Sequence, residues 1–187
     1  MGGRIGLDMP QGTVRQGQAL VGTRGAVRYH PIDINWPMVQ FYASVVEDGH
    51  PGYWDPDWAR QQSGAIQSPP GMLMVWGMPF DWTPVAATNS DGGALNIPLP
   101  GTTIINVSTD TEFIRPMLVG DRLSTQEQLV AVSDEKHTRL GTGCFLTTRT
   151  AYHNQRGELV AIHTNEVFRY TPSQPAPETA EEGPADA

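Results

Sequence analysis

The chain has 187 residues, a formal net charge of −8 and a composition that is 39% hydrophobic and 17% charged. This length suits one domain with a substantial core, and the acidic balance, with Lys136 as the sole lysine, argues against nucleic acid or an anionic membrane as a partner. Cys144 is the only cysteine, which excludes an internal disulfide and suits a reducing compartment.

A flexible segment, a strand and a helix are predicted for the first quarter of the chain. Residues 1–18 are rich in glycine and glutamine and are expected to be flexible. Residues 19–32 look like a first strand that leads into the helix. Asn35 can cap this helix and Pro37 fits its first turn, and apolar residues then recur every three to four positions as far as residue 46.

Two further helices are predicted beyond a short polar turn over residues 48–53. A glycine and a proline in this turn end the first helix. Asp55, followed by a proline, starts a second and short helix that ends near Gly64. The stretch Ser68-Pro69-Pro70-Gly71 begins a third helix over residues 72–78. That helix is apolar almost all round, which is typical of a helix buried on every side, here by a sheet.

The remainder of the chain has mostly β-type sequence. Residues 79–101 are rich in proline, glycine, asparagine and aspartate, and we expect this long loop to border a pocket or a partner surface. Alternating, β-branched runs then predict strands over residues 103–114, 122–132, 139–153 and 158–170. Residues 173–187 are acidic and proline-rich, which predicts a disordered tail. Strands that follow a group of helices predict an α+β fold with an antiparallel sheet.

Five stretches of the chain together carry a family resemblance: Asn35 to Met38, Glu47 to Tyr53, Ser68 to Met72 with Val75 and Trp76, the turn from Pro116 to Asp121, and Lys136 with Thr138 to Gly143. They resemble the MaoC-like hydratases and dehydratases of the hotdog fold. The resemblance covers residues 21–172, within a domain that we place at residues 19–172. It implies a long central helix wrapped by an antiparallel sheet of five or more strands.

The turn after the first helix departs from the pattern of active family members, which carry Asp-x-Asn-Pro-x-His. Asp48 and Pro51 match that pattern, whereas His50 stands where asparagine is usual and Tyr53 stands where the catalytic histidine is usual. The chain is therefore most similar to the histidine-lacking, fatty-acid-synthase-type dehydratase-like subunits of heteromeric enoyl-CoA hydratases of steroid side-chain degradation. The resemblance implies that a partner subunit supplies the Asp/His pair and that this chain shapes a pocket for a bulky acyl chain.

The chemistry of hydration explains why this departure matters. Water must be held and deprotonated while a proton reaches the alpha carbon of the 2-enoyl thioester, and a carboxylate with an imidazole does both near neutral pH. Tyr53 has a reference pKa of about 10 and is a poor base at pH 7, while His50 is an alternative base two residues from Asp48. The backbone N–H of Gly71 suits stabilisation of the thioester oxygen, and Trp76 is a second candidate substrate-binding residue.

Each candidate also has a purely structural interpretation. Asp48 and His50 are common types of turn residue, and Tyr53 can serve as amphipathic packing. Trp76, together with the methionines at positions 72, 74 and 78, fits a role in the core. The histidines show no spacing typical of metal ligands and no glycine-rich phosphate loop follows a strand, so we expect neither a metal nor a nucleotide cofactor, with the CoA thioester acting as substrate.

Three functions remain open from the sequence. The chain is a pocket-forming subunit of an enoyl-CoA hydratase, a self-sufficient homodimeric hydratase that uses Asp48 and His50, or a hotdog thioesterase or acyl-CoA binding module. A hotdog sheet has an exposed edge that needs covering, so we expect a related hotdog subunit or a second copy of the chain to join it edge to edge. Because no apolar run of membrane-spanning length and no signal-peptide pattern occurs, we expect a cytoplasmic protein.

Overall fold

The computed structural model describes residues 9–79 and 93–173, without the side chains of residues 94 and 95. Its α-helices and 3-10 helices are α1 (Val14–Gln18), α2 (Trp36–Val45), α3 (Pro51–Trp54), α4 (Pro56–Ser63), η1 (Pro70–Met72), η2 (Val75–Gly77) and η3 (Gly93–Asn96). Its strands are β1 (Arg28–Tyr29), β2 (Gln67–Ser68), β3 (Thr103–Phe113), β4 (Met117–Leu118), β5 (Ser124–Val132), β6 (Lys136–Thr138), β7 (Gly141–His153) and β8 (Leu159–Pro172). The tail predicted from residue 173 onward lies, beyond that residue, outside the described part of the chain.

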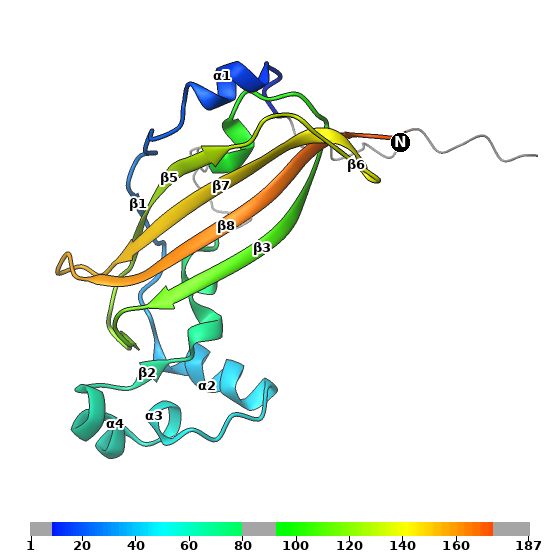
Figure 1. The fold of residues 1–187 in the computed structure, drawn as a ribbon. Helices are drawn as coiled ribbons and strands as arrows, with labels where there is room; N and C mark the ends of the chain where they lie inside the picture. The colour runs from blue at the N-terminus through cyan, green and yellow to red at the C-terminus, as the bar shows by residue number, and fades with distance from the viewer. Residues whose placement is uncertain (1–8, 80–92, 174–187) are drawn as a thin grey trace, which may run out of the picture.

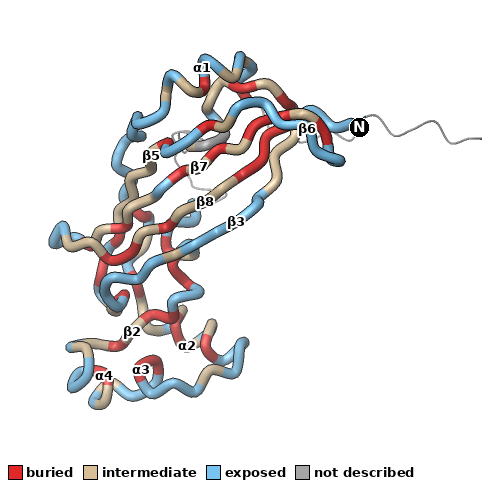
Figure 2. The backbone as a smooth tube through the Cα atoms, in the orientation of Figure 1, coloured by how far each residue is buried: buried red, intermediate tan, exposed pale blue. Residues whose placement is uncertain are grey.

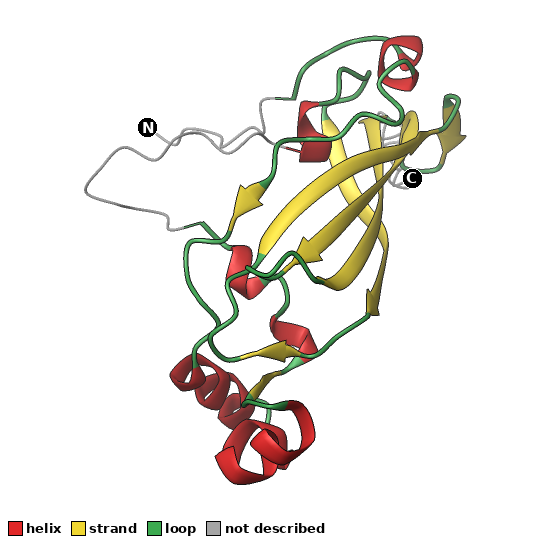
Figure 3. Ribbon diagram, turned by 90° about the vertical axis from the view of Figure 1, so that its left-hand side faces the viewer, coloured by secondary structure: helices red, strands yellow, loops and turns green. Residues whose placement is uncertain are grey.

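One curved antiparallel sheet dominates the molecule, with small helices at its two ends (Figure 1). In the described part of the chain this sheet has six strands in the order β1-β5-β7-β8-β3, with β6 paired to the start of β7. Strands β2 and β4 form a separate antiparallel pair. Figure 3 shows α2, α3 and α4 gathered beyond one end of the sheet. The predicted α+β class, the antiparallel sheet and the four long strands are confirmed.

The capping signals at the two predicted helices after residue 35 have the expected geometry. The side chain of Asn35 accepts a hydrogen bond from the N–H of Met38 at 3.1 Å, at the start of α2. The carboxylate of Asp55 accepts from the N–H groups of Asp57 and Trp58 at the start of α4. Helix α4 ends at Gly64, whose φ of 88° lies in the left-handed region that glycine tolerates.

The prediction of one long buried helix from about residue 70 is wrong for the described residues. This stretch forms two single 3-10 turns, η1 and η2, and the side chains of Met74 and Met78 are 61% and 63% exposed. The apolar run is bounded by residues that disfavour a helix interior, namely Gly71, Gly77 and Pro79. The stretch between them is short, and a long helix does not form. The apolar side chains on the other side of this run, including Trp76, are buried as expected.

The N-terminal predictions also need correction. Within the segment expected to be flexible, Thr13 and Gln16 form a capping box that starts α1. The strand predicted over residues 19–32 is reduced to the two residues of β1 and one isolated bridge between Arg24 and Gln128. Gly22 has a φ of 92°, which interrupts the extended backbone, so this segment follows β5 through separate hydrogen bonds instead of a continuous ladder.

Two apolar clusters form the core. Figure 2 shows buried stretches along the central strands β7 and β8. The helical-end cluster joins the sheet to α2, α3, α4 and the 3-10 turns, and its buried members are Ile34, Val39, Ala43, Tyr53, Ala59, Ile66, Met72, Leu73, Trp76, Met117, Leu123, Tyr152, Val160 and Ala161. The α1-end cluster contains Leu99, Leu129, Val132, Cys144, Leu146 and Val167. Because strand residues two apart share a face, Thr148 and Thr150 of β7 lie between the two clusters, beside His163 of β8.

A buried arginine closes the α1 end of the sheet. Arg169 is 0% exposed, and its guanidinium donates to the carbonyl oxygens of Pro10 at 2.7 Å, Ile97 at 2.7 Å and Gly101 at 3.1 Å. These bonds tie the N-terminal segment and the residues before β3 to β8. Residues 97–101, the described end of the long predicted loop, are therefore held at this end of the sheet, while residues 80–92 of that loop lie outside the described residues.

Replacing Arg169 with methionine should lower the free energy of unfolding by about 3 kcal/mol, because three buried carbonyl groups lose their donor. Urea unfolding followed by circular dichroism measures this loss. Arg149, an exposed arginine on β7, is the matched control, and its replacement by methionine should change stability by less than about 0.5 kcal/mol. Equal losses in the two variants would contradict the role given to Arg169.

A second buried polar group, His30, makes stability depend on pH. The ring is 6% exposed, packs edge-on against Tyr152 at 5.9 Å between ring centroids, and has an Nδ1 atom without a hydrogen-bond partner in the described part of the chain. Burial lowers the pKa of His30 from 6.5 to about 4. The folded state therefore favours the neutral ring, while the unfolded chain takes up the proton more readily.

The contribution of neutral His30 to the unfolding free energy is complete above pH 6.5 and is lost as the pH falls toward 4. Urea unfolding at several pH values should show that the unfolding free energy falls by on the order of 3 kcal/mol over this range because of His30. The His30→Phe variant should lack this part of the fall. The exposed His137 on β6 offers a control through His137→Gln. An unchanged pH dependence in His30→Phe would show that His30 is not responsible.

Candidate functional site

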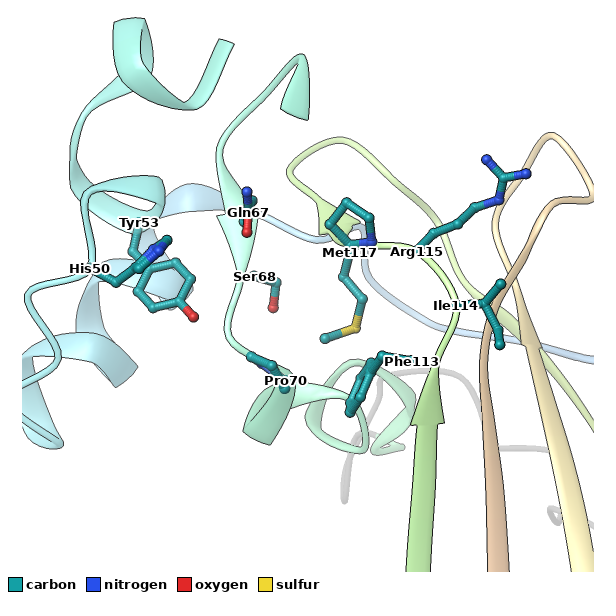
Figure 4. A pocket seen from close by; sticks show the side chains of 10 residues that line it. His50, Tyr53, Gln67, Ser68, Pro70, Phe113, Ile114, Arg115 and Met117 are labelled. Carbon is teal, nitrogen blue, oxygen red and sulfur yellow. The ribbon is translucent and has the colours of Figure 1, made fainter. Parts of the chain in front are cut away.

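A pocket of about 340 Å³ lies between α3, β2, η1 and the segment that follows β3 (Figure 4). Its described lining consists of His50, Tyr53, Gln67, Ser68, Pro70, Phe113, Ile114, Arg115, Pro116 and Met117. The structure thus brings two of the sequence-predicted site residues, His50 and Tyr53, to the same cavity. The opposite wall comes from residues 113–117, which the sequence did not indicate as part of a site.

The first half of the predicted polar turn holds His50 as a helix cap. The N–H of His50 donates to the Asp48 carboxylate at 3.0 Å, and the His50 Nδ1 atom accepts the N–H of Gly52 at 3.2 Å. The ring also contacts Trp58 edge-on, at 5.4 Å between centroids. Because Nδ1 is the acceptor, a neutral His50 carries its proton on Nε2. In this arrangement the imidazole offers the pocket a donor, and a role as base requires the cap to break.

Asp48 shapes the turn from outside the described lining of the pocket. Its carboxylate is engaged by the His50 N–H, and its backbone carbonyl accepts the indole N–H of Trp54 at 2.8 Å. The side chain is partly buried. The contact between Asp48 and His50 therefore runs through the backbone N–H of His50 and not through its ring.

Tyr53 is held firmly against the wall of the pocket. The residue is 8% exposed, and its backbone carbonyl accepts the indole N–H of Trp36 at 2.9 Å. Figure 4 shows the phenol directed into the cavity. Burial raises the pKa of Tyr53, and the negative charge of Asp48 acts in the same direction. Near neutral pH the phenol is protonated and acts as a hydrogen-bond donor.

Trp76 reaches the pocket through Ser68. The indole is completely buried, and its N–H donates to Ser68 Oγ at 3.0 Å. Ser68, on β2, lines the pocket and is 5% exposed. The sequence analysis named Trp76 and missed Ser68. The signal for Ser68 was its position directly before the Pro-Pro-Gly stretch, which was interpreted as a helix start and as part of the family resemblance, with no role given to the serine side chain.

Gly71 directly follows Pro70, which lines the pocket, and lies against the hydroxyl end of the Tyr42 side chain. A Cβ atom at position 71 would collide with the hydroxyl of Tyr42 on α2. The N–H groups of Met72 and Leu73 donate to carbonyls within η1. The absence of a side chain at Gly71 therefore permits close packing of α2 against η1, next to the cavity.

The described residues contain neither a metal-binding cluster nor a membrane-spanning helix. Within residues 9–79 and 93–173, no three histidine, cysteine or acidic side chains are grouped closely enough to hold a metal ion. Among the helices of these same ranges, none has the length and apolar character needed to cross a lipid bilayer.

Comparison with known proteins identifies the family. A family model described as "FAS1-like, dehydratase domain region" matches residues 19–163. The chain belongs to this family. A curated relative from Thermomonospora curvata, described as "Probable enoyl-CoA hydratase alpha subunit", is 33% identical over 164 residues, which are 84% of this chain and 51% of the relative. The chain thus spans about half the length of that relative.

Solved structures show the same fold. The crystal structure of the ChsH1-ChsH2 complex from Mycobacterium tuberculosis matches with a TM-score of 0.66 and 22% identity, over 88% of this chain and 92% of that chain. A MaoC-like dehydratase from Rhodospirillum rubrum matches with a TM-score of 0.56 and 20% identity, over 82% and 94% of the two chains. The chain therefore has the hotdog fold expected from its resemblance to MaoC-like proteins.

Replacing Gly71 with alanine should cost about 1–2 kcal/mol of unfolding free energy, because the added methyl group overlaps the Tyr42 hydroxyl. The double variant Gly71→Ala/Tyr42→Phe should recover most of this loss, since the hydroxyl is the nearest obstacle. Urea unfolding of the two single variants and the double variant completes the cycle. Strictly additive losses would contradict the close contact.

Proposed function

We propose that this chain is a cytoplasmic subunit of an enoyl-CoA hydratase that binds the acyl-CoA thioester and shapes its pocket, while a related hotdog subunit supplies the Asp/His pair. The observation that carries the proposal is the pocket itself, which has hydrogen-bond donors and apolar walls and is lined by Tyr53, the residue that the family resemblance matches to the catalytic histidine of active members. No cofactor is needed, because the CoA thioester is the substrate.

The described lining of the pocket can bind a ligand, but the candidate bases at this site are either protonated or engaged in hydrogen bonds. Tyr53 is a phenol whose pKa is raised, so it does not accept a proton from water at neutral pH. The Nδ1 atom of His50 accepts a backbone N–H, and the Asp48 carboxylate accepts another. General-base assistance is typically worth 10²–10⁴-fold in rate, so a hydratase built on this pocket depends on a base from elsewhere.

The edge of the sheet supports a partner at this pocket. Among the described residues, strand β3 pairs only with β8, which places it at one edge of the sheet, and its last residue, Phe113, lines the pocket. An unpaired edge strand is a template for pairing with another chain. A subunit joined to β3 would therefore stand next to the cavity. The Thermomonospora curvata relative is itself described as an alpha subunit, and the Mycobacterium tuberculosis structure is a complex of two differently named proteins.

The lining of the pocket supports a proposal for the kind of acyl group. Phe113, Ile114 and Met117 supply a broad apolar wall, which suits a bulky acyl chain better than a short one. We take a steroid side-chain thioester as the proposed substrate class, in line with the resemblance to subunits of that kind.

A self-sufficient hydratase that uses Asp48 and His50 is the second candidate, because His50 lines the pocket. A self-association through β3 would then replace the related subunit. The two candidates differ in whether the imidazole of His50 takes part in the reaction, and a single substitution separates them. His50→Asn removes the imidazole and keeps a good helix cap, since asparagine is among the preferred N-cap residues.

The purified chain alone should hydrate 2-octenoyl-CoA slowly or not at all, and addition of a hotdog subunit with an intact Asp-x-Asn-Pro-x-His turn should raise the rate by about 10²–10⁴-fold. Loss of the conjugated-enone absorbance measures hydration, and free-thiol release in the same sample measures thioester cleavage. His50→Asn should leave the rate of the two-subunit mixture within about twofold.

Full activity of the isolated chain that His50→Asn abolishes and Tyr53→Phe retains would establish the self-sufficient enzyme instead. Thiol release that keeps pace with substrate loss would identify a thioesterase. Each of these results would overturn the proposed two-subunit hydratase.

A further inference from the structure

Two buried hydroxyl groups face the same space in the pocket. Figure 4 shows the oxygen of Tyr53, from α3, and that of Ser68, from β2, both directed toward the centre of the cavity, with Pro70 and Met117 beside them. Tyr53 is 8% exposed and Ser68 is 5% exposed. Buried polar side chains normally have hydrogen-bond partners.

The hydroxyl hydrogen of Ser68 lacks a good acceptor among the described residues. Ser68 Oγ accepts the indole N–H of Trp76 at 3.0 Å, while its own donation goes to the carbonyl of the neighbouring Pro69 at 3.5 Å, the outer limit for such a bond. An indole N–H is a donor only. Trp76 therefore occupies an acceptor position on Ser68 Oγ and leaves the hydroxyl hydrogen available to the cavity.

The position of Ser68 is fixed on two sides. Its backbone pairs with Met117 in the β2–β4 ladder, and its side chain is held by Trp76, which is 0% exposed within the helical-end cluster. A donor that is held in place before the ligand arrives loses little conformational freedom on binding. Trp76 is accordingly a positioning residue for Ser68.

We infer that Tyr53 and Ser68 together form a two-donor site for the carbonyl oxygen of an acyl thioester, with Trp76 holding Ser68 in place. This inference rests on the proposed function and adds the atoms that recognise the substrate. Two neutral hydroxyl donors match an uncharged acceptor with two lone pairs. The apolar walls from Phe113 and Met117 suit the acyl chain next to that oxygen.

Binding of two ligands that differ only in the carbonyl tests the inference. Octanoyl-CoA carries the thioester carbonyl, whereas S-octyl-CoA is a thioether of the same length without it. Isothermal titration of the full chain, alone and with its hotdog partner, should show that Ser68→Ala and Tyr53→Phe each weaken octanoyl-CoA roughly three- to tenfold, the effect of one neutral hydrogen bond. Both variants should bind S-octyl-CoA as the unsubstituted chain does.

The control is Ser44→Ala on α2, because Ser44 is exposed and its hydroxyl bonds only to a carbonyl of its own helix in the described contacts. It should change neither affinity. Trp76→Phe should also weaken octanoyl-CoA selectively. The infrared carbonyl stretch of bound [1-¹³C]octanoyl-CoA should shift to higher frequency in Ser68→Ala, Tyr53→Phe and Trp76→Phe, which a purely structural role for these residues would not produce.

Equal losses of affinity for both ligands in Ser68→Ala and Tyr53→Phe, or no loss for either, would overturn the two-donor site while leaving the proposed function in place. A chain that binds neither of these ligands nor a steroid side-chain enoyl-CoA, alone or with its partner, would overturn the proposed function and the two-donor site together. A selective loss in Ser68→Ala and Tyr53→Phe with an unchanged infrared band would overturn the assignment of the carbonyl oxygen as the recognised atom.

Discussion

The burial of Trp76 is the constraint on which the pocket depends. Its fully buried indole belongs to the helical-end cluster, the apolar core that joins α2, α3 and α4 to the sheet. Its N–H holds Ser68, and the same cluster contains Tyr53 and Met117 from opposite walls of the cavity. Removing a large aromatic side chain from such a core typically costs 3–5 kcal/mol. The shape of the site and the stability of this half of the molecule therefore rest on one packing arrangement.

The turn at residues 48–53 is ordered by hydrogen bonds between its own residues. His50 caps the short helix that Pro51 begins, and the Asp48 carboxylate accepts the backbone N–H of His50. Tyr53 then presents to the pocket a phenol that donates hydrogen bonds and does not accept protons at neutral pH. A short capped helix therefore places a hydrogen-bond donor, and not a proton acceptor, on this wall of the pocket.

Local signals predicted the parts of the fold that are decided locally. The caps at Asn35 and Asp55 and the alternating strands were predicted correctly, since each depends on residues close in sequence. The long helix from residue 70 was not, because an apolar run carries no periodicity that separates one helix from two 3-10 turns between glycines. The proximity of His50 and Tyr53 follows from their spacing, whereas the wall from Phe113 to Met117 reaches the pocket only through the fold. Arg169 and Pro10 are 159 residues apart, beyond any sequence pattern.

The division of the core into two clusters has a mechanical consequence. Among the described residues, Thr148, Thr150 and His163 lie between the α1-end cluster and the helical-end cluster, and the two clusters share no buried member. Regions of a protein that share few buried contacts open independently and behave as separate cooperative units. A partner that rearranges α2, α3 and α4 would leave the end closed by Arg169 undisturbed, and the long strands would act as a rigid frame against which the helices adjust.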